Sequence, residues 1–515
     1  MPQLVYSTRL AQLCAATGVE TVFIPEELWN TPLTEAFSDA KGNIATAEGI
    51  PEIDFQTVST GTADGAIMAA AGYRHAGGPP AAVVLDASVD FLATLDKIAQ
   101  AVRDKLSMII ILVTPDESFN GITANWASLA TGVGAVAVPG GEAQNISQAM
   151  VEVIEGLNKQ LPAVLLVDPE NLDAELTDEA EPEFEAPRTG AVPQASQVTR
   201  AAKSLAQARW PLIIAGRGAR HAKSSMVALA NTTGALLATS AGAHGLFEDQ
   251  QFNIGTLGRI STPSTAELAR GADVIVVFGC ALDNWTTRDG RLISPNAVII
   301  QVDTSPWAVG RFSAVSQSLI ADAQAVASAL EVEASKLISE AKTGYRTEQT
   351  LERLDTKYWN SRPIPEHQLR ENTVDPRAFL DRLEQVLPKQ RTVVVDQSAQ
   401  AGYATNYLRV LDHKGYMFFS SGAVVAGMGA SIARDDRMVV VVTHQSGLMD
   451  SLADFRTAVK SLKRGALVVF EQEAPVAELT RHYGLPVHEI TNLDQLNEQM
   501  FSEGVVVLAV QQHQN

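Results

Sequence analysis

Apolar residues in this chain occur in short runs rich in valine and isoleucine, which are separated by longer stretches with helical spacing. Short continuous apolar runs are typical of strands in parallel sheets that helices cover on both faces. We predict helices between these runs, for example over residues 65–75 and 376–386. The alternation predicts an α/β protein built from doubly wound parallel sheets. The expected strands cover residues 21–24, 82–85, 108–113, 163–167, 212–215, 274–278, 297–302, 392–395, 438–442, 466–470 and 505–510.

Two polar segments divide this pattern into three units. Residues 169–193 are acidic and contain prolines, and residues 340–376 are polar with few strand signals. A chain of 515 residues is too long for a single hydrophobic core. We therefore predict three parallel-sheet domains, over residues 1–170, 191–335 and 372–515.

The charge balance excludes some classes of partner. The chain carries 39 basic and 59 acidic residues, a formal net charge of −20. Binding to nucleic acid needs a basic face that neutralises phosphates, so we expect no nucleic-acid partner. No apolar run reaches the ~18 residues of a membrane-spanning helix, and the first 14 residues lack the apolar core of a signal peptide. We expect no membrane partner and a cytoplasmic location.

The two cysteines, Cys14 and Cys280, lie far apart in apolar segments. We expect both to be reduced core residues, because the chain has neither a disulfide framework nor a CxxC pattern. The nine histidines show no metal-ligand spacing either. We predict no metal site from these residue types.

Several local sequences carry a family resemblance. They are residues 10–24 (LAQLCAATGVETVFI), 66–78 (AIMAAAGYRHAGG), 209–218 (RWPLIIAGRG), 272–303 (which begins ADVIVVFG) and 392–398 (TVVVDQS), with Asp454-Phe455 and Thr457-Ala458. In this order they resemble the acetolactate synthase and benzoylformate decarboxylase group of thiamine-diphosphate (ThDP) enzymes, over essentially the whole chain. The resemblance implies a pyrimidine-binding-like domain, a central domain and a diphosphate-binding-like domain. It also implies ThDP and magnesium as cofactors.

The family uses a glutamate to hydrogen-bond the aminopyrimidine of ThDP. Counted back from Gly72, that position falls on Ala63, whose methyl group cannot take part in proton chemistry. Asp64 is adjacent, but neighbouring residues on a helix point about 100° apart, so it would substitute only if the register slipped by one. Otherwise Asp64 is a solvated carboxylate in a first helical turn, where the helix dipole favours it.

The family holds magnesium through an aspartate in a Gly-Asp-Gly sequence and through an asparagine on the next strand. Here residues 443–446 read Thr-His-Gln-Ser, which puts the aspartate position on Gln445 and the asparagine near Glu471-Gln472. Magnesium prefers at least one carboxylate ligand, and a glutamine is neutral. We expect no ordinary ThDP–magnesium binding at these cofactor positions, Ala63, Gln445 and Gln472.

Other departures from the family fall on the same site. The glycine-rich stretch over residues 420–433 is about four residues shorter than the family's, and the covering segment after Glu473 is missing. Residues 284–288 resemble a stretch near the flavin of acetolactate synthases without its usual charged pair, so we consider FAD unlikely. The losses cluster at one pocket, which indicates relaxed or redirected selection there.

Three side chains are candidates for new chemistry at strand ends. Glu27 follows the strand at 21–24, Glu471 follows the strand at 466–470, and His444 follows the strand at 438–442. A histidine there could act as a general base near neutral pH, or be a hydrogen-bonded structural residue that fills the former cofactor space. Glu27 could instead belong to a helix start, where acidic residues are favoured.

Three functions stay open. The first is a protein of the 2-oxo acid carboligase and decarboxylase lineage, a lyase or transferase by descent, whose altered pocket acts on a small polar or acidic metabolite. The second is a non-catalytic scaffold or regulatory paralogue that pairs with an active relative. The third is a true ThDP-dependent enzyme with divergent ligands. The resemblance implies a homodimer or homotetramer, because the family builds its site between two subunits.

Overall fold

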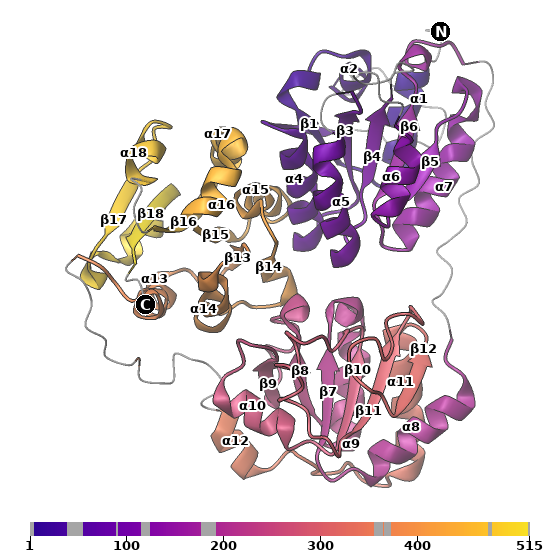
Figure 1. Ribbon diagram of the computed structural model, residues 1–515, viewed down its shortest axis with the longest axis vertical. Coiled ribbons are helices and arrows are strands. Elements are labelled where there is room, and N and C mark those ends of the chain that lie inside the picture. Colours follow the sequence, from indigo (N-terminus) through magenta and orange to yellow (C-terminus); the bar gives the residue numbers. More distant parts are fainter. Residues whose placement is uncertain are drawn as a thin grey trace.

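The computed structural model has three α/β domains, each built on a six-stranded sheet (Figure 1). Every strand pairing in the three sheets is parallel. This confirms the predicted class of doubly wound parallel-sheet domains. The structure describes residues 5–38, 55–88, 91–114, 124–176, 192–354, 364, 372–471 and 476–512.

The N-terminal sheet has the strand order β2-β1-β3-β4-β6-β5. Its strands are β1 (Thr21–Pro25), β2 (Gln56–Thr60), β3 (Ala81–Asp86), β4 (Ile109–Val113), β5 (Val136–Pro139) and β6 (Ala163–Val167). The helices around it are α1 (Tyr6–Ala16), α2 (Pro32–Ser38), α4 (Ala63–Ala76), α5 (Phe91–Asp104), α6 (Trp126–Gly132) and α7 (Ile146–Asn158). A short 3₁₀ turn, η1 (Glu26–Leu28), follows β1 directly.

The central sheet has the order β12-β11-β10-β7-β8-β9. Its strands are β7 (Pro211–Ala215), β8 (Leu236–Thr239), β9 (Asn253–Thr256), β10 (Val274–Phe278), β11 (Val298–Asp303) and β12 (Gln317–Ile320). The helices are α8 (Ala195–Gln207), α9 (Lys223–Thr233), α10 (Pro263–Arg270), α11 (Ala323–Leu337) and α12 (Glu348–Leu354), with a 3₁₀ segment η4 (Arg217–Ala222) after β7. Residues of the polar segment 340–376 join this domain, since the Tyr345 hydroxyl donates to the carbonyl of Leu268.

The C-terminal sheet has the order β14-β13-β15-β16-β18-β17. Its strands are β13 (Arg391–Val395), β14 (Tyr416–Phe418), β15 (Met438–His444), β16 (Arg464–Glu471), β17 (Val487–Ile490) and β18 (Gly504–Gln511). The helices are α13 (Pro376–Val386), α14 (Ala399–Tyr407), α15 (Ala423–Ala433), α16 (Gln445–Asp450), α17 (Leu452–Ser461) and α18 (Val476–Arg481). The 3₁₀ turn η7 (His413–Gly415) precedes β14.

All the strands expected from apolar runs are present, with ends shifted by one or two residues. In the described part of the chain, the structure adds seven strands that the pattern did not predict: β2, β5, β8, β9, β12, β14 and β17. Each has three to five residues, and all but β8 lie at a sheet edge. Short edge strands bury less apolar surface, so their sequences carry a weaker signal.

Helices α4 and α15 join the N-terminal and C-terminal domains. One cluster of buried apolar residues spans both domains and includes the inner faces of both helices. The two backbones approach closely, because a Cβ atom added at Gly72 would meet the carbonyl of Ala426, and one added at Gly429 would meet the carbonyl of Ala69. Glycine at these positions therefore permits the contact between the domains.

Two further expectations concern the chain as a whole. Both cysteines are buried and free, as predicted. Burial raises the pKa of Cys14 to about 12 and that of Cys280 to about 11, so both thiols stay protonated at neutral pH. Among the described residues, the helices are too short or too polar for any of them to traverse a bilayer.

Candidate functional site

The glutamate position of the family lies at the start of α4. Thr62 is the N-cap of this helix, and its hydroxyl accepts a hydrogen bond from the backbone N–H of Gly65 at 2.9 Å. Ala63 follows in the first turn and is buried. The Ala63 methyl group faces the C-terminal domain of the same chain, since Ala63 and Asp454 line one cavity.

This interdomain cavity has a volume of about 450 Å³. The N-terminal domain contributes the start of α4 and two residues of α5, and the C-terminal domain contributes the start of α15 and the junction of α16 and α17. The polar side chains in the lining are Thr62, Asp64, Lys97, Ser421, Asp450, Ser451 and Asp454. Three carboxylates and one ammonium give the lining a negative balance.

Lys97 holds the two walls of the interdomain cavity together. Its ammonium donates to Ser421 Oγ in the C-terminal domain at 2.9 Å and to Asp96 on its own helix at 2.7 Å. The Asp64 carboxylate lies 4.0 Å from the same ammonium. Asp64 is thus oriented by a lysine, and only about a third of its side chain is exposed. The expectation of a solvated first-turn carboxylate described its place on the helix but not this neighbour.

Asp454 closes the cavity from the C-terminal side. Its carboxylate accepts the backbone N–H of Thr62 at 2.9 Å and the Thr62 hydroxyl at 2.7 Å. Burial raises the pKa of Asp454, and the hydrogen bonds from Thr62 oppose that rise. The sequence comparison used Asp454 only to set the frame, whereas the structure gives it two hydrogen bonds from the N-terminal domain.

The end of β15 places His444 at a helix cap. Its Nδ1 accepts the backbone N–H of Ser446 at 3.3 Å and lies 3.2 Å from Ser446 Oγ, so His444 caps α16. Gln445 is the first residue of α16 and is half-buried. Neither residue lines the interdomain cavity. The geometry gives His444 a structural role and leaves Gln445 outside the cavity that Ala63 lines.

A carboxylate that the sequence pattern did not single out lies beside this strand end. Asp396 follows β13, and the Thr443 hydroxyl donates to its Oδ2. Burial raises the pKa of Asp396, and its Oδ1 is buried without a hydrogen-bond partner in the described structure. A Cβ atom at Gly447 would collide with this carboxylate. The signal that could have revealed Asp396 is its place directly after the apolar run at 392–395, on the strand next to β15.

Glu471 is buried and fully engaged at the end of β16. Its Oε2 accepts the backbone N–H of Val476 at 2.8 Å, and its Oε1 accepts the side-chain amide of Gln511. Burial raises its pKa. His444 is in register with Phe470, one residue before Glu471, so the side chains of His444 and Glu471 leave opposite faces of the sheet. They therefore do not converge on one reacting atom.

Glu27 lies outside the interdomain cavity, in the 3₁₀ turn after β1 rather than at the end of β15 or β16. It belongs to η1 and is exposed, while its neighbour Glu26 accepts the Thr457 hydroxyl at 3.4 Å. Glu27 does not line the interdomain cavity. Gln472 lies outside the described residues. Within one chain the structure brings Ala63 to a cavity, and it places Glu27, His444, Gln445 and Glu471 elsewhere.

Ala63 and Gln445 lack the carboxylates that the family resemblance implies at these positions for ThDP and magnesium. Both oxygens of Glu471 already accept hydrogen bonds, and Gln445 offers only a neutral amide. The methyl group of Ala63 cannot donate or accept the proton that the pyrimidine exchanges. No cofactor-dependent step can be derived from this set.

A second cavity, of about 570 Å³, lies where the three domains meet. Its walls include the residues after β7, β8, β10 and β13, at the carboxyl ends of parallel strands. The turn after β7 does not leave an open phosphate cradle, because a Cβ atom at Gly216 would meet the carbonyl of Gly279 and the Cys280 side chain. The glycines there serve packing between two strand ends.

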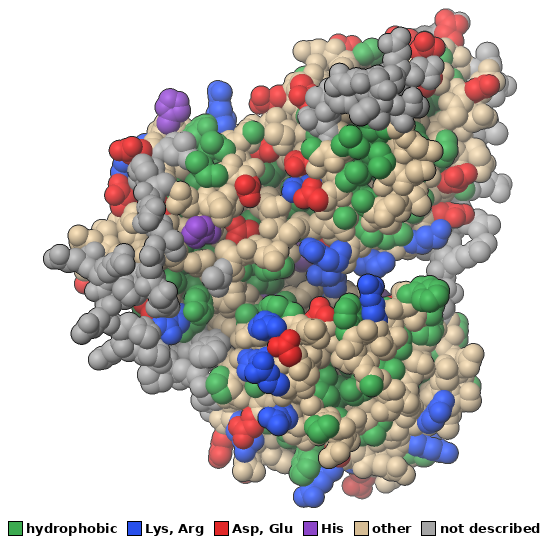
Figure 2. All heavy atoms as spheres, viewed as in Figure 1, with side chains coloured by type: hydrophobic (Ala, Val, Ile, Leu, Met, Phe, Trp, Pro, Cys, Tyr) green, Lys and Arg blue, Asp and Glu red, His purple; other side chains and the backbone are tan. Residues whose placement is uncertain are grey.

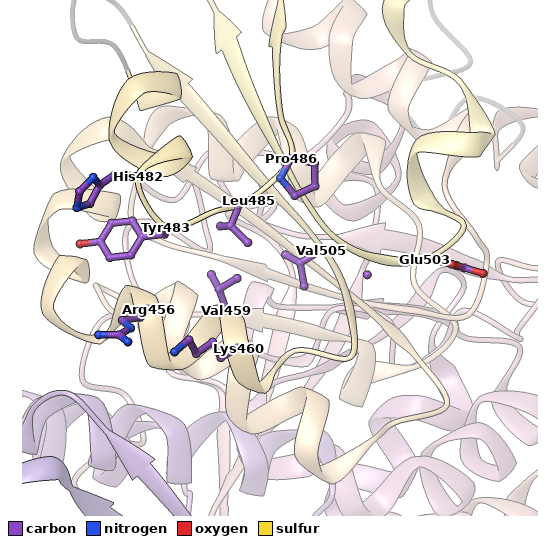
Figure 3. Close-up of a pocket in the computed structure, with 10 residues that line it drawn as sticks. Arg456, Val459, Lys460, His482, Tyr483, Leu485, Pro486, Glu503 and Val505 are labelled. Atoms are coloured by element: carbon purple, nitrogen blue, oxygen red, sulfur yellow. The ribbon is translucent and has the colours of Figure 1, made fainter.

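A third cavity, of about 640 Å³, lies within the C-terminal domain (Figure 3). Val459, Leu485 and Val505 line it, and the exposed Arg456 and Lys460 lie on the same helix as Val459. Gly504 and Val505 are the first residues of β18, so the cavity is at the amino end of the sheet. Ligands of open α/β sheets bind at the carboxyl ends, and none of the candidate site residues reaches this cavity.

The fold and the domain order define a three-domain α/β protein of the ThDP-enzyme type. Residues 5–128 match the model described as "Thiamine pyrophosphate enzyme, N-terminal TPP binding domain", and residues 198–330 match "Thiamine pyrophosphate enzyme, central domain". The chain belongs to the thiamine pyrophosphate enzyme family, as the sequence resemblance predicted.

Two acetolactate synthases are similar to this chain at low sequence identity. The chain is 29% identical over 189 residues to the acetolactate synthase large subunit of Corynebacterium glutamicum. The aligned region covers 35% of this chain and 30% of the relative. It is 22% identical over 400 residues to the acetolactate synthase of Mycobacterium leprae, covering 73% of this chain and 62% of the relative. The match thus spans less than two thirds of either relative.

One solved structure covers nearly the whole chain. It comes from Mycobacterium smegmatis and is provisionally assigned as a thiamin diphosphate-dependent enzyme. The TM-score is 0.75 at 17% identity, over 99% of this chain and 100% of that one. At this identity the similarity establishes the fold alone.

Proposed function

We propose that this protein is an acetolactate synthase-like family member that does not use ThDP and magnesium in the family's manner, and that its interdomain cavity binds a small polar metabolite. One observation carries the proposal. At the glutamate position, the buried methyl group of Ala63 faces a polar cavity of about 450 Å³ that Asp64, Lys97 and Asp450 line. A volume of this size suits a small metabolite.

The charge of the cavity indicates the kind of ligand. Asp64, Asp450 and Asp454 outnumber the single cation Lys97 in the lining. A lining with a negative balance of charge favours a ligand with an amine or several hydroxyl groups over an anion. The 2-oxo acids of the acetolactate synthase lineage are anions, and this lining supports a different substrate.

The first test measures thermal unfolding with and without ThDP plus magnesium, with pyrophosphate plus magnesium as a ligand control. A ligand at ~100 times its dissociation constant stabilises a protein by about 2.7 kcal/mol. We expect no shift specific to ThDP. The Corynebacterium glutamicum acetolactate synthase large subunit serves as the reference protein in the same assay. A saturable shift that pyrophosphate does not reproduce would overturn the proposal and favour a true ThDP enzyme.

The second test screens amines and polyols for thermal stabilisation and follows each hit by calorimetric titration. Asp450 is exposed at the cavity, so Asp450→Asn removes one lining charge without disturbing the core. We expect about tenfold weaker binding of a cationic hit. The matched control is Asp173→Asn, which changes the same charge on an exposed residue outside the cavity. A hit that both variants bind equally would contradict binding in this cavity.

The second candidate is a non-catalytic scaffold. It is favoured by the structural roles of His444, which caps a helix, and Glu471, whose two carboxylate oxygens both accept hydrogen bonds. An unproductive metabolite screen, together with co-purification of a catalytic relative, would favour it. We also propose that the chain forms a homodimer or homotetramer, which light scattering of the purified protein tests.

A further inference from the structure

A cationic pocket lies at the junction of the three domains. It has a volume of about 320 Å³ and takes lining residues from all of them. Arg74 and Lys105 come from the N-terminal domain, Arg217 and Arg220 from η4 of the central domain, and Lys414 from η7 of the C-terminal domain. None of its lining residues is an aspartate or a glutamate. Figure 2 shows Lys and Arg side chains gathered along the boundary between the N-terminal and central domains.

Carboxylates beside the cationic pocket balance only part of this charge, since Asp322 lies 2.8 Å from His221 and Asp412 accepts hydrogen bonds from Arg437. Asp104 lies 3.1 Å from the Arg217 guanidinium, but it is also 3.2 Å from Arg103, which does not line the cationic pocket. Arg220 donates to the backbone carbonyl of Asp104 at 3.0 Å. The Asp104 carboxylate is therefore shared between two guanidinium groups, those of Arg103 and Arg217.

Within the described part of the chain, the guanidinium of Arg74 donates hydrogen bonds to neutral acceptors only. Its donors reach the carbonyl and the hydroxyl of Ser107, at 2.8 and 2.9 Å, and the carbonyl of Gly78. Neutral acceptors satisfy the N–H groups and leave the positive charge uncompensated. The guanidinium is fixed in position by these bonds, which keeps it at the pocket wall.

The end of α4 accounts for only part of the positive charge. Gly77 is the C-cap of this helix, and a Cβ atom there would meet Lys414 Nζ. A helix C-terminus carries roughly half a negative charge and attracts cations. That accounts for Lys414 and for Arg74, which is in the last turn of α4, whereas Lys105 and Arg220 remain.

His75 and His413, which line the cationic pocket, lie in the same positive field. Burial and the adjacent positive charge of Arg220 lower the pKa of His413 to about 4 and hold the pKa of His75 well below its usual value. Burial and the charge of Arg217 lower the pKa of Arg220 to about 10. These three groups come from three domains, and each resists carrying another positive charge.

We propose that the cationic pocket binds a small phosphate-class anion, such as inorganic phosphate, pyrophosphate or a phosphate monoester, and so ties the three domains together. Guanidinium groups bind phosphate oxygens in pairs, and lysines add point charge. A volume of about 320 Å³ admits a phosphate or pyrophosphate group but not a dinucleotide. In a chain of net charge −20, this concentration of cations is local.

The inference is independent of the proposed function, because the cationic pocket shares no residue with the interdomain cavity. Anion binding in the cationic pocket would affect how the domains are arranged. The anion would contact residues that lie in three domains, so binding would favour the domain arrangement seen here.

The test is calorimetric titration of the full-length protein with pyrophosphate and with phosphate at constant ionic strength, with chloride as the screening control. Lys105 and Lys414 are exposed, so the double variant Lys105→Gln/Lys414→Gln keeps the fold. We expect saturable pyrophosphate binding that weakens about tenfold in the double variant. The matched control Lys389→Gln, on an exposed residue of the C-terminal domain outside the cationic pocket, should bind as the wild type does.

Three results would overturn the inference. They are no saturable binding by the wild-type protein, equal binding by the double variant, and tighter binding of citrate than of pyrophosphate. Because ThDP carries a diphosphate group, its thermal titration is repeated in the double variant. If the double variant loses the thermal shift with ThDP, the result supports anion binding in the cationic pocket. If the shift persists in the double variant, the proposed function is overturned, and the pyrophosphate titration alone decides whether the cationic pocket binds an anion.

Discussion

The carboxylate of Asp454 accepts two hydrogen bonds from Thr62, one from its backbone N–H at 2.9 Å and one from its hydroxyl at 2.7 Å. The two residues are 392 positions apart in the chain and lie in different domains. Thr62 in turn caps α4, the helix that packs on α15. One carboxylate thus fixes both a helix start and the contact between the N-terminal and C-terminal domains.

Replacing Asp454 by alanine should cost about 2–4 kcal/mol of unfolding free energy, because two charge-assisted hydrogen bonds are lost and Thr62 is left unpaired. Asp454→Asn keeps one acceptor oxygen and should cost about half as much. Urea unfolding of both variants measures the difference. Equal costs for the two variants would show that the hydrogen bonds contribute little.

The pH dependence of the same pair has a definite sign. The hydrogen bonds from Thr62 persist when Asp454 is ionised. Because burial raises the pKa of Asp454, its protonated form adds further stability, which is fully present below the unfolded pKa of about 3.8 and is lost as the pH rises through the folded value. The wild-type protein should therefore gain stability relative to Asp454→Asn as the pH falls from 7 toward 4. Urea midpoints at several pH values measure this gap, and a gap that widens in the opposite direction would contradict it.

Contact between α4 and α15 requires glycine. Gly429→Ala places a methyl group on the carbonyl of Ala69, so the helices must separate, and we expect a loss of about 3 kcal/mol or more. Gly132 is the control, since a Cβ atom there would have no described neighbour within 4 Å. Gly132→Ala should be neutral or stabilising by up to about 1 kcal/mol. Similar destabilisation in the two variants would mean that the helix contact does not limit stability.

An ion pair in the C-terminal domain predicts acid sensitivity. Asp412 accepts two hydrogen bonds from Arg437, at 3.0 and 2.6 Å, and despite the opposing effect of burial these bonds lower the pKa of Asp412 to about 2. Its stabilising contribution is present above pH 4 and is lost as the pH falls from about 4 to about 2.

The size of this effect is moderate. The fall of the Asp412 pKa from 3.8 to about 2 corresponds to at most about 2.5 kcal/mol. The Asp412 side chain is 35% exposed, and solvent screening reduces the value to about 1 kcal/mol. Asp412→Asn should be less stable than the wild type at pH 6 by this amount, and the difference should shrink at pH 3. Chemical unfolding at the two pH values tests this, and a constant difference would refute the ion-pair explanation.

His444 offers a test that separates a helix cap from a general base. His444→Ala removes the bond to the N–H of Ser446 and should cost about 1 kcal/mol. His444→Asn restores a capping oxygen and should recover most of that stability. If the metabolite screen finds a reaction, we expect His444→Asn to retain it. Loss of the reaction in a stable His444→Asn protein would instead identify His444 as a catalytic base.

The candidate site was only partly visible in the sequence. The register placed Ala63 correctly at the start of a helix and Gln445 directly after a strand, because both follow from local patterns. The prediction that Glu27, His444 and Glu471 belong to one altered pocket concerned a site between two subunits, and it stays a prediction. Side-chain direction at the strand ends sends His444 and Glu471 to opposite faces, and Glu27 remains exposed beside η1.

By itself, the sequence determined the class of fold and the domain order. Strands of a parallel sheet are buried on both faces, so they appear in the sequence as continuous apolar runs such as residues 438–442. The sequence also determined the family. Only the tertiary structure decided which residues meet across domains: Thr62 with Asp454, Gly429 with Ala69, and Arg220 with His75. These contacts join residues that are far apart in the chain, and no local pattern of apolar and polar positions records them. The interdomain cavity and the cationic pocket both arise from such contacts.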